Sequence, residues 1–320
     1  MEIHVLAFPT YDCYNSHYEI NCNFFQILKT IGDIAMKRVG SFFFTFVPML
    51  LALGLQFAAM FLAMGVSGLL ESLWYAPSGK ISFSDIYTDL MVLWTNNRFN
   101  TGIMIIYSVS CIAIFGLWYY SRYEGNFLPK LSAVFHPLSI FGIILLTPAA
   151  QFLTSYLINF VAFLFPSWLE AYEKLIESAG LDEKISIGMF CYSVLLAPFS
   201  EELIFRGVTL RQAKKALPFW AANLLQAILF GIFHLNMIQG IYAFCLALLL
   251  GYICEKSGSI YNSILLHLLF NLYGTVLSGL FSFGDSAFAL IACFFFSIFA
   301  AILGFFFFQL GTKSMQAVCE

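Results

Sequence analysis

Residues 287–310 read AFALIACFFFSIFAAILGFFFFQL and contain no Asp, Glu, Lys, Arg or His. A run of about 20 apolar residues is long enough to cross the roughly 30 Å hydrocarbon core of a bilayer as an α-helix. The apolar residues are continuous rather than alternating, which favours a helix over a strand of a membrane barrel. This stretch alone predicts a transmembrane helix.

The rest of the chain has the same character. Of its 320 residues, 61% are hydrophobic and only 10% are charged, and the mean hydropathy is +0.85. A soluble domain of this length needs more charge to cover its surface. The net charge of −3 and the lack of a basic cluster argue against a nucleic-acid-binding protein. The composition therefore predicts an all-α, polytopic membrane protein.

The apolar runs predict about eight transmembrane helices and one membrane domain. The fourth and fifth helices are the hardest to delimit, because Arg211, Lys214 and Lys215 lie between them and Pro218 suits the start of the fifth. We expect a membrane domain at 41–310, with its polar core at about 188–281. A segment at 1–40 precedes it and a tail at 311–320 follows it. The predicted spans are 41–66, 102–121, 138–164, 188–206, 219–235, 238–254, 259–281 and 287–310.

Two further helices are expected outside these spans. Apolar residues recur at helical spacing over 24–35, with Lys29 and Asp33 between them, which is typical of a helix lying in the membrane interface. The segment 167–179 shows a capping-box pair, Ser167 and Glu170, and is followed by Gly180. We interpret this segment as a surface helix or a lid between two spans.

The loops also predict an orientation. If eight helices cross the membrane, the 15 Lys and Arg residues divide into 11 on one side and four on the other. Cytoplasmic loops carry the excess of Lys and Arg. This division predicts that both termini are cytoplasmic.

Ionisable side chains within the predicted spans are few and clustered. Each costs about 2.5–3.5 kcal/mol on insertion scales, so such residues usually have a function. Five occur, all on three spans: Glu201, Glu202, Arg206, His234 and His267. Their concentration predicts a single site.

Helix geometry suggests distinct roles for these residues. Glu202 and Arg206 are one turn apart, so they are expected to form a buried ion pair with a structural role. Glu201 is rotated by about 100° from Glu202 and is therefore free to face a cleft. His267 and Asn271 share a face one turn apart. Alone, each His or Asn could be a packing or interhelical hydrogen-bonding residue.

Together, these groups suit the hydrolysis of a peptide bond. A carboxylate helped by an imidazole can orient and deprotonate water. A histidine and an amide can then stabilise the oxyanion that forms at the attacked carbonyl. We therefore expect the side chains of Glu201, His234, His267 and Asn271 to line one cavity.

Three motifs in this region resemble a known family. Residues 201–206, EELIFR, have the pattern EExxxR; residues 230–234, FGIFH, have FxxxH; and residues 267–271, HLLFN, have HxxxN. In this order and spacing they resemble the CPBP intramembrane proteases. That family includes type II CAAX prenyl endopeptidases, bacteriocin-processing and immunity proteins, and lysostaphin-resistance-like proteins. The resemblance covers roughly 190–275.

The resemblance implies a role for each residue. Glu201 would activate water with the help of His234, and His267 and Asn271 would form the oxyanion site, with a membrane-associated peptide or protein as substrate. Zinc bound by Glu201, His234 and His267 is the alternative, but the sequence has no HExxH helix and the ligands would come from three helices. We therefore prefer a mechanism without a cofactor. A non-catalytic scaffold or immunity protein and a transporter remain alternative functions.

Overall fold

The computed structural model describes residues 35–75, 83–123, 134–179, 185–277 and 286–319. All regular structure in these ranges is helical, as predicted. Six of the helices are long and apolar enough to cross a membrane, so the chain is an integral multi-pass membrane protein. They span Ala35–Tyr75, Asn97–Arg122, Pro137–Leu164, Ile187–Ala213, Met237–Ser257 and Ala287–Ser314.

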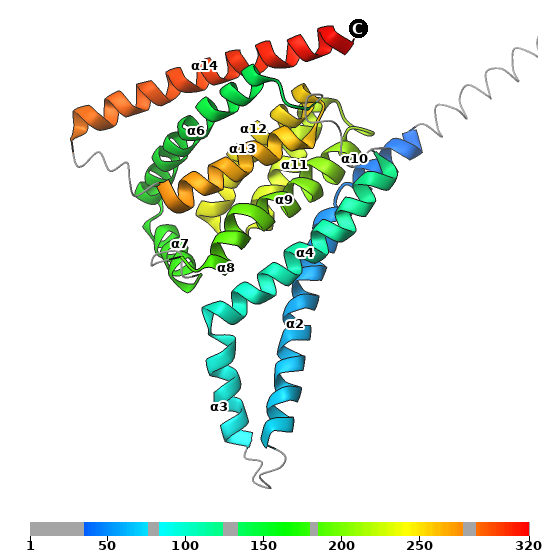
Figure 1. Cartoon of the computed structure of the whole chain (residues 1–320), viewed down its shortest axis with the longest axis vertical. Helices are drawn as coiled ribbons and strands as arrows, with labels where there is room; N and C mark the ends of the chain where they lie inside the picture. The colour runs from blue at the N-terminus through cyan, green and yellow to red at the C-terminus, as the bar shows by residue number, and fades with distance from the viewer. Residues whose placement is uncertain (1–34, 76–82, 124–133, 180–184, 278–285, 320) are drawn as a thin grey trace, which may run out of the picture.

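The predicted number of eight spans is not confirmed. The expected spans 219–235 and 259–281 are helices, but α11 covers only Phe219–Phe233 and α13 only Ile260–Leu272, with a π-helical continuation, η4, at Tyr273–Leu277. The helix α13 lies within the bundle (Figure 1), and none of its residues is exposed. In contrast, α11 exposes Trp220, Leu224, Ile228 and Ile232 and is shorter than the six spans. Both looked like full spans in the sequence because hydropathy alone does not distinguish a core helix or a short apolar helix from a spanning one.

The first helical run is longer than predicted. It continues through α2, Val47–Tyr75, well beyond the expected end at residue 66. The helix α3, Phe83–Trp94, was not predicted and packs on α2. Between them the Trp94 indole donates to Ser67 Oγ at 3.0 Å, and the Tyr75 hydroxyl donates to Asp89. In Figure 1 this pair of helices extends away from the rest of the bundle, while α4, Asn97–Arg122, leads back into it.

The expected surface helix at 167–179 is present as α7, Pro166–Ser178. Its predicted capping pair is wrong. Pro166 already occupies the first turn, so the N-cap is Phe165 and Ser167 lies too far inside the helix to cap it. Gly180 lies outside the described residues, as do residues 24–34 of the interfacial helix predicted at 24–35.

Two close helix pairs hold the bundle together. The helix α12, Met237–Ser257, runs antiparallel to α11, and a Cβ at Gly231 would lie only 2.7 Å from the Gly240 carbonyl oxygen. In the same pair, Asn223 and Gln226 donate to the Leu248 and Ala247 carbonyls, both at 3.0 Å. These contacts fix α11 against α12, and with it His234, the residue that follows α11.

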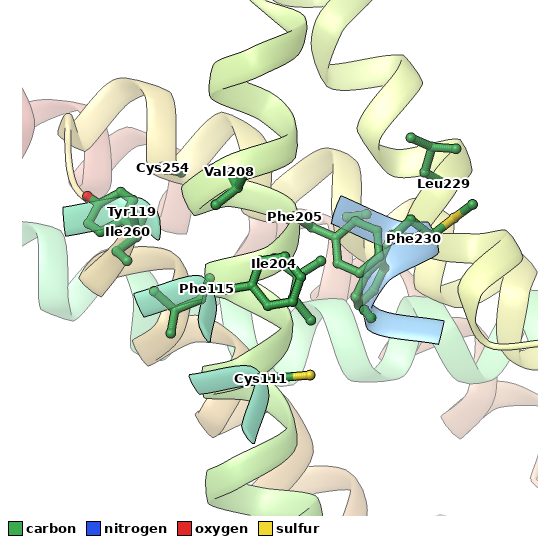
Figure 2. Close-up of a cluster of buried hydrophobic side chains, with 14 of the residues drawn as sticks. Cys111, Phe115, Tyr119, Ile204, Phe205, Val208, Leu229, Phe230, Cys254 and Ile260 are labelled. Atoms are coloured by element: carbon green, nitrogen blue, oxygen red, sulfur yellow. The ribbon is translucent and has the colours of Figure 1, made fainter. Parts of the chain in front are cut away.

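The second pair is formed by α6, Pro137–Leu164, and α14, Ala287–Cys319 (Figure 1). A Cβ at Gly142 would lie 2.5 Å from the Phe308 amide nitrogen, so the two backbones nearly touch. The helix α14 continues past the predicted boundary at 310. Side chains of α2, α4, α11, α12, α13 and the helical segment at Leu203–Leu210 make up the main apolar core (Figure 2).

Candidate active site

One helical run contributes three of the predicted site residues. It consists of α8, Ile187–Phe190; η2, Cys191–Leu196; α9, Ala197–Glu202; η3, Leu203–Leu210; and α10, Arg211–Ala213. The segments η2 and η3 are π-helical, and the Thr209 hydroxyl accordingly donates to the Ile204 carbonyl five residues earlier, at 2.8 Å. Glu201 and Glu202 lie between these segments, in the position where π-helical bulges often accompany a functional site.

The predicted ion pair between Glu202 and Arg206 is present. Arg206 Nη1 lies 2.9 Å from Glu202 Oε1, and both side chains are completely buried. The guanidinium carbon also lies 4.6 Å from the centre of the Phe230 ring, a cation–π contact. Phe230 packs edge-on against Phe205 in the apolar core (Figure 2). The Arg206 charge is therefore held by one carboxylate and one aromatic ring.

The imidazole of His267 lies between the two glutamates. Its Nδ1 is 2.8 Å from Glu202 Oε1, the same oxygen that Arg206 contacts. Its Nε2 is 3.7 Å from Glu201 Oε2, which is longer than a hydrogen bond. Because a carboxylate only accepts, Nδ1 carries a hydrogen whenever Glu202 is ionised. Glu202 thus orients the ring and directs Nε2 toward Glu201.

Asn271 has a partner that the sequence did not reveal. Its Nδ2 donates to the Ser193 carbonyl at 2.8 Å. That carbonyl lacks both usual helix donors, because the Ala197 N–H donates to Tyr192 and Pro198 has no N–H. Asn271 therefore joins α13 to η2 with one N–H, while its amide keeps a second N–H for another acceptor.

Replacing Asn271 with Ala should therefore lower the free energy of unfolding by about 1–3 kcal/mol, since a partly buried carbonyl loses its donor. Chemical or thermal unfolding of the purified protein measures this loss. The matched control is Asn159→Ala, because Asn159 also donates to a serine carbonyl, at 2.9 Å, but is exposed. We expect a change within about 0.5 kcal/mol for the control. Equal stability of the two variants would contradict an anchoring role for Asn271.

His234 ends α11 at a tight reversal of the chain. Its Nδ1 is 2.8 Å from the Phe230 carbonyl, which only accepts, so Nδ1 carries the hydrogen and Nε2 of the neutral ring is free to accept. The next residue, Leu235, has a φ of 54°, a left-handed conformation that is rare for leucine. Asn236 then caps α12. The His234 ring is thus fixed by its own helix end and by the strained turn after it.

The structure brings five of the six predicted residues into one region, and Asn271 lies one turn after His267. Contacts connect Arg206, Glu202, His267 and Glu201 in series. The Phe230 ring lies 4.7 Å from the His234 ring and 6.0 Å from the His267 ring, measured between centres. His234 also interacts electrostatically with Glu201 and His267.

Two residues near this region had no predicted role. Phe230 touches Arg206 and both histidines, and its spacing of four from His234 was the available signal. The Ser193 carbonyl lacks a backbone donor in its own helix. The sequence indicates this only through Pro198, five residues later, and only if the helix there is π-helical.

The residues do not form a ready zinc site. Among the residues that the structure describes, no three His, Cys, Asp or Glu side chains are placed to hold one metal ion. Nδ1 of His267 faces Glu202 and Nδ1 of His234 faces the Phe230 carbonyl, so only Nε2 of each ring is left as a ligand. The preference for a mechanism without a cofactor stays a prediction.

Comparison with protein families adds an independent observation. Residues 183–273, which contain every predicted site residue, match the family model described as type II CAAX prenyl endopeptidase Rce1-like. This segment is therefore similar to an Rce1-like domain. The Rce1-like family is one of CAAX-type membrane proteases, so the predicted resemblance is confirmed at the level of the family. No curated protein and no solved structure matches the chain.

Proposed function

We propose that the chain is an intramembrane endopeptidase in which Glu201 and His234 activate the attacking water. The observation that carries this proposal is the difference between the two glutamates. The Glu201 side chain is 16% exposed and lies 3.7 Å from His267 Nε2, whereas Glu202 is fully buried against Arg206. Only Glu201 combines an open face with a neighbouring imidazole, so it is the carboxylate that water and a substrate can reach.

The contacts suggest a sequence of steps. Glu201 takes a proton from water while Nε2 of His234 orients it, and the water oxygen forms a bond with the scissile carbonyl carbon. His267, donating from Nε2 while Nδ1 donates to Glu202, and the second N–H of Asn271 stabilise the oxyanion. The C–N bond then breaks as the leaving amine takes the proton from Glu201. Arg206 keeps Glu202 ionised, so that His267 stays oriented throughout.

We also propose that the end of the bundle rich in Lys and Arg faces the cytoplasm. The Lys214–Glu255 ion pair and the hydrogen bond from Asn262 to the Val134 carbonyl place the ends of α10 and α12 and the starts of α6 and α13 at one end. At the opposite end, the cations in the described part of the chain are Arg98 and Lys174. Such an asymmetry supports a cytoplasmic location for the basic end. The cations there are Lys37, Arg38, Arg122, Arg211, Lys214, Lys215, Lys256 and Lys313.

Sequencing of reaction products tests the proposed activity. The purified protein, reconstituted in bilayer discs, is incubated with three sets of peptides: prenylated CAAX peptides, unprenylated CAAX peptides and membrane-anchored precursors. We expect new termini at defined bonds in at least one set, and none with the Glu201→Gln variant. Identical products from both proteins would remove Glu201 from the mechanism. No products from either protein would overturn the assignment as a peptidase and favour a non-catalytic scaffold.

Removal of metal tests the preferred mechanism. We expect purified active protein to contain well under about one equivalent of zinc and to keep its activity after exhaustive chelation, because no metal would generate the nucleophile. Elemental analysis and cleavage rates before and after chelation measure this. Loss of activity with the chelator and recovery on addition of zinc would show a metalloendopeptidase instead.

A further inference from the structure

A pocket at the basic end lies away from the predicted catalytic residues. It has a volume of about 470 Å³ and lies between Phe44 on the first helical run, the end of α4, and the residues that follow η3. Two hydrogen bonds close its inner side: Tyr123 donates to Gln212 at 3.2 Å, and Gln212 donates to the Ser41 carbonyl at 3.5 Å. Three segments distant in sequence thus build the pocket together.

Two cations without a carboxylate partner line this pocket. Arg122 and Lys215 are both exposed and form no ion pair with any described residue, whereas the neighbouring Lys214 is paired with Glu255. None of the residues that line the pocket is acidic. The pocket therefore concentrates positive charge that no carboxylate in the described part of the chain compensates.

An aromatic ring contacts one of these cations, and further rings line the pocket. Lys215 Nζ lies 5.0 Å from the centre of the Tyr123 ring. The Trp118 ring stacks on Phe115, with centres 6.0 Å apart, and meets Phe44 edge-on at 5.8 Å. Tryptophan and tyrosine are enriched at the depth of lipid headgroups. Aromatic side chains thus form one wall of the pocket, and their presence is typical of the depth at which lipid headgroups lie.

Next to the pocket, exposed side chains of α2 and α4 are apolar. Ile114 lies one turn before Trp118, and Leu117 one turn before Ser121, and their side chains are 38% and 70% exposed. Leu51 on α2 is 37% exposed. An amphiphile can therefore place an anionic group among the cations and its chains along α2 and α4. A soluble anion would use only the upper half of this surface.

We propose that this pocket binds the phosphate of an anionic phospholipid headgroup. Pockets formed by basic residues between membrane helices on the cytoplasmic side suit such headgroups. Serine, tyrosine and glutamine side chains in the wall supply neutral hydrogen-bonding groups beside the two cations. The proposal concerns binding alone and does not depend on the proposed peptidase activity.

Native mass spectrometry of the full-length protein with added lipid tests the proposal. The probes are phosphatidylglycerol and phosphatidylcholine with the same acyl chains. We expect the protein to retain phosphatidylglycerol in preference to phosphatidylcholine. The double variant Arg122→Ala/Lys215→Ala should weaken this binding at least about tenfold, since each basic residue near an anionic headgroup contributes separately.

Matched variants separate the pocket from general surface charge. Lys256→Ala/Lys313→Ala removes the same charge from exposed positions at the same end and should bind as the wild type does. Arg122→Lys/Lys215→Arg keeps the charge and should retain binding, which also shows that loss in the alanine variant does not reflect misfolding. Equal weakening by both alanine variants would overturn the proposal. So would binding of inorganic phosphate alone as tightly as the lipid.

Discussion

Replacement of Glu201 with Gln should lower the cleavage rate by about 10²–10⁴-fold, the usual contribution of a positioned general base. The amide has the shape of the carboxylate but cannot take a proton from water. The His267 Nε2 that faces it at 3.7 Å makes no direct hydrogen bond, so little of the folded structure depends on the Glu201 charge. We therefore expect the free energy of unfolding to change by less than about 1 kcal/mol.

Cleavage assays and unfolding curves of the same preparation check both halves of this prediction. The control is Glu177→Gln, an exposed position on α7, which should leave the cleavage rate and the stability unchanged. A Glu201→Gln variant that is as active as the control would remove Glu201 from the mechanism. A large loss of stability would show that Glu201 is a structural residue.

Replacement of Arg206 with Ala should have the largest effect on stability, about 3–5 kcal/mol, because it leaves the fully buried Glu202 carboxylate without its cation. It also removes the contact with the Phe230 ring. Chemical unfolding of the purified variant measures the loss. The exposed Arg98→Ala variant, at the start of α4, is the control and should be nearly as stable as the wild type.

A second substitution shows whether the loss comes from the unpaired charge. Combining Arg206→Met with Glu202→Gln removes both charges and fills most of the volume, so this double variant should be more stable than Arg206→Ala alone. Activity should nevertheless stay low, because a neutral amide at position 202 cannot hold His267 as the carboxylate does. A double variant no more stable than Arg206→Ala would contradict the importance of the buried ion pair.

The sequence was sufficient to predict the ion pair of the site but not the contacts between its helices. Glu202 and Arg206 are one turn apart, and the rotation of Glu201 away from Glu202 follows from helix geometry. In the structure this rotation places the two carboxylates near different nitrogens of the same imidazole. Which ring they would meet could not be predicted, because His267 lies on α13 and its position depends on packing between helices.

The helix lengths were predictable only in part. The run at 138–164 corresponds closely to α6, and the run at 287–310 to the first part of α14. The helix α13 has no exposed residue, so its apolar residues reflect burial in protein rather than contact with lipid, whereas α11 also exposes apolar side chains, Trp220, Leu224, Ile228 and Ile232. The π-helical segments could not be predicted, since the hydrogen bonds that define them depend on tertiary contacts such as Asn271 with Ser193.

The oxygen shared by Arg206 and His267 has an evolutionary consequence. Because Glu202 Oε1 contacts both the buried cation and the imidazole that we propose to be catalytic, stability and the proposed chemistry cannot change independently at this position. Substitution of Glu202 by an uncharged residue would leave the buried Arg206 without its carboxylate and would remove the group that orients His267. Positions 202, 206 and 267 are thus coupled, so functional descendants of this protein should either keep all three residues or replace them together. Laboratory evolution for greater stability should then find its improvements elsewhere in the chain.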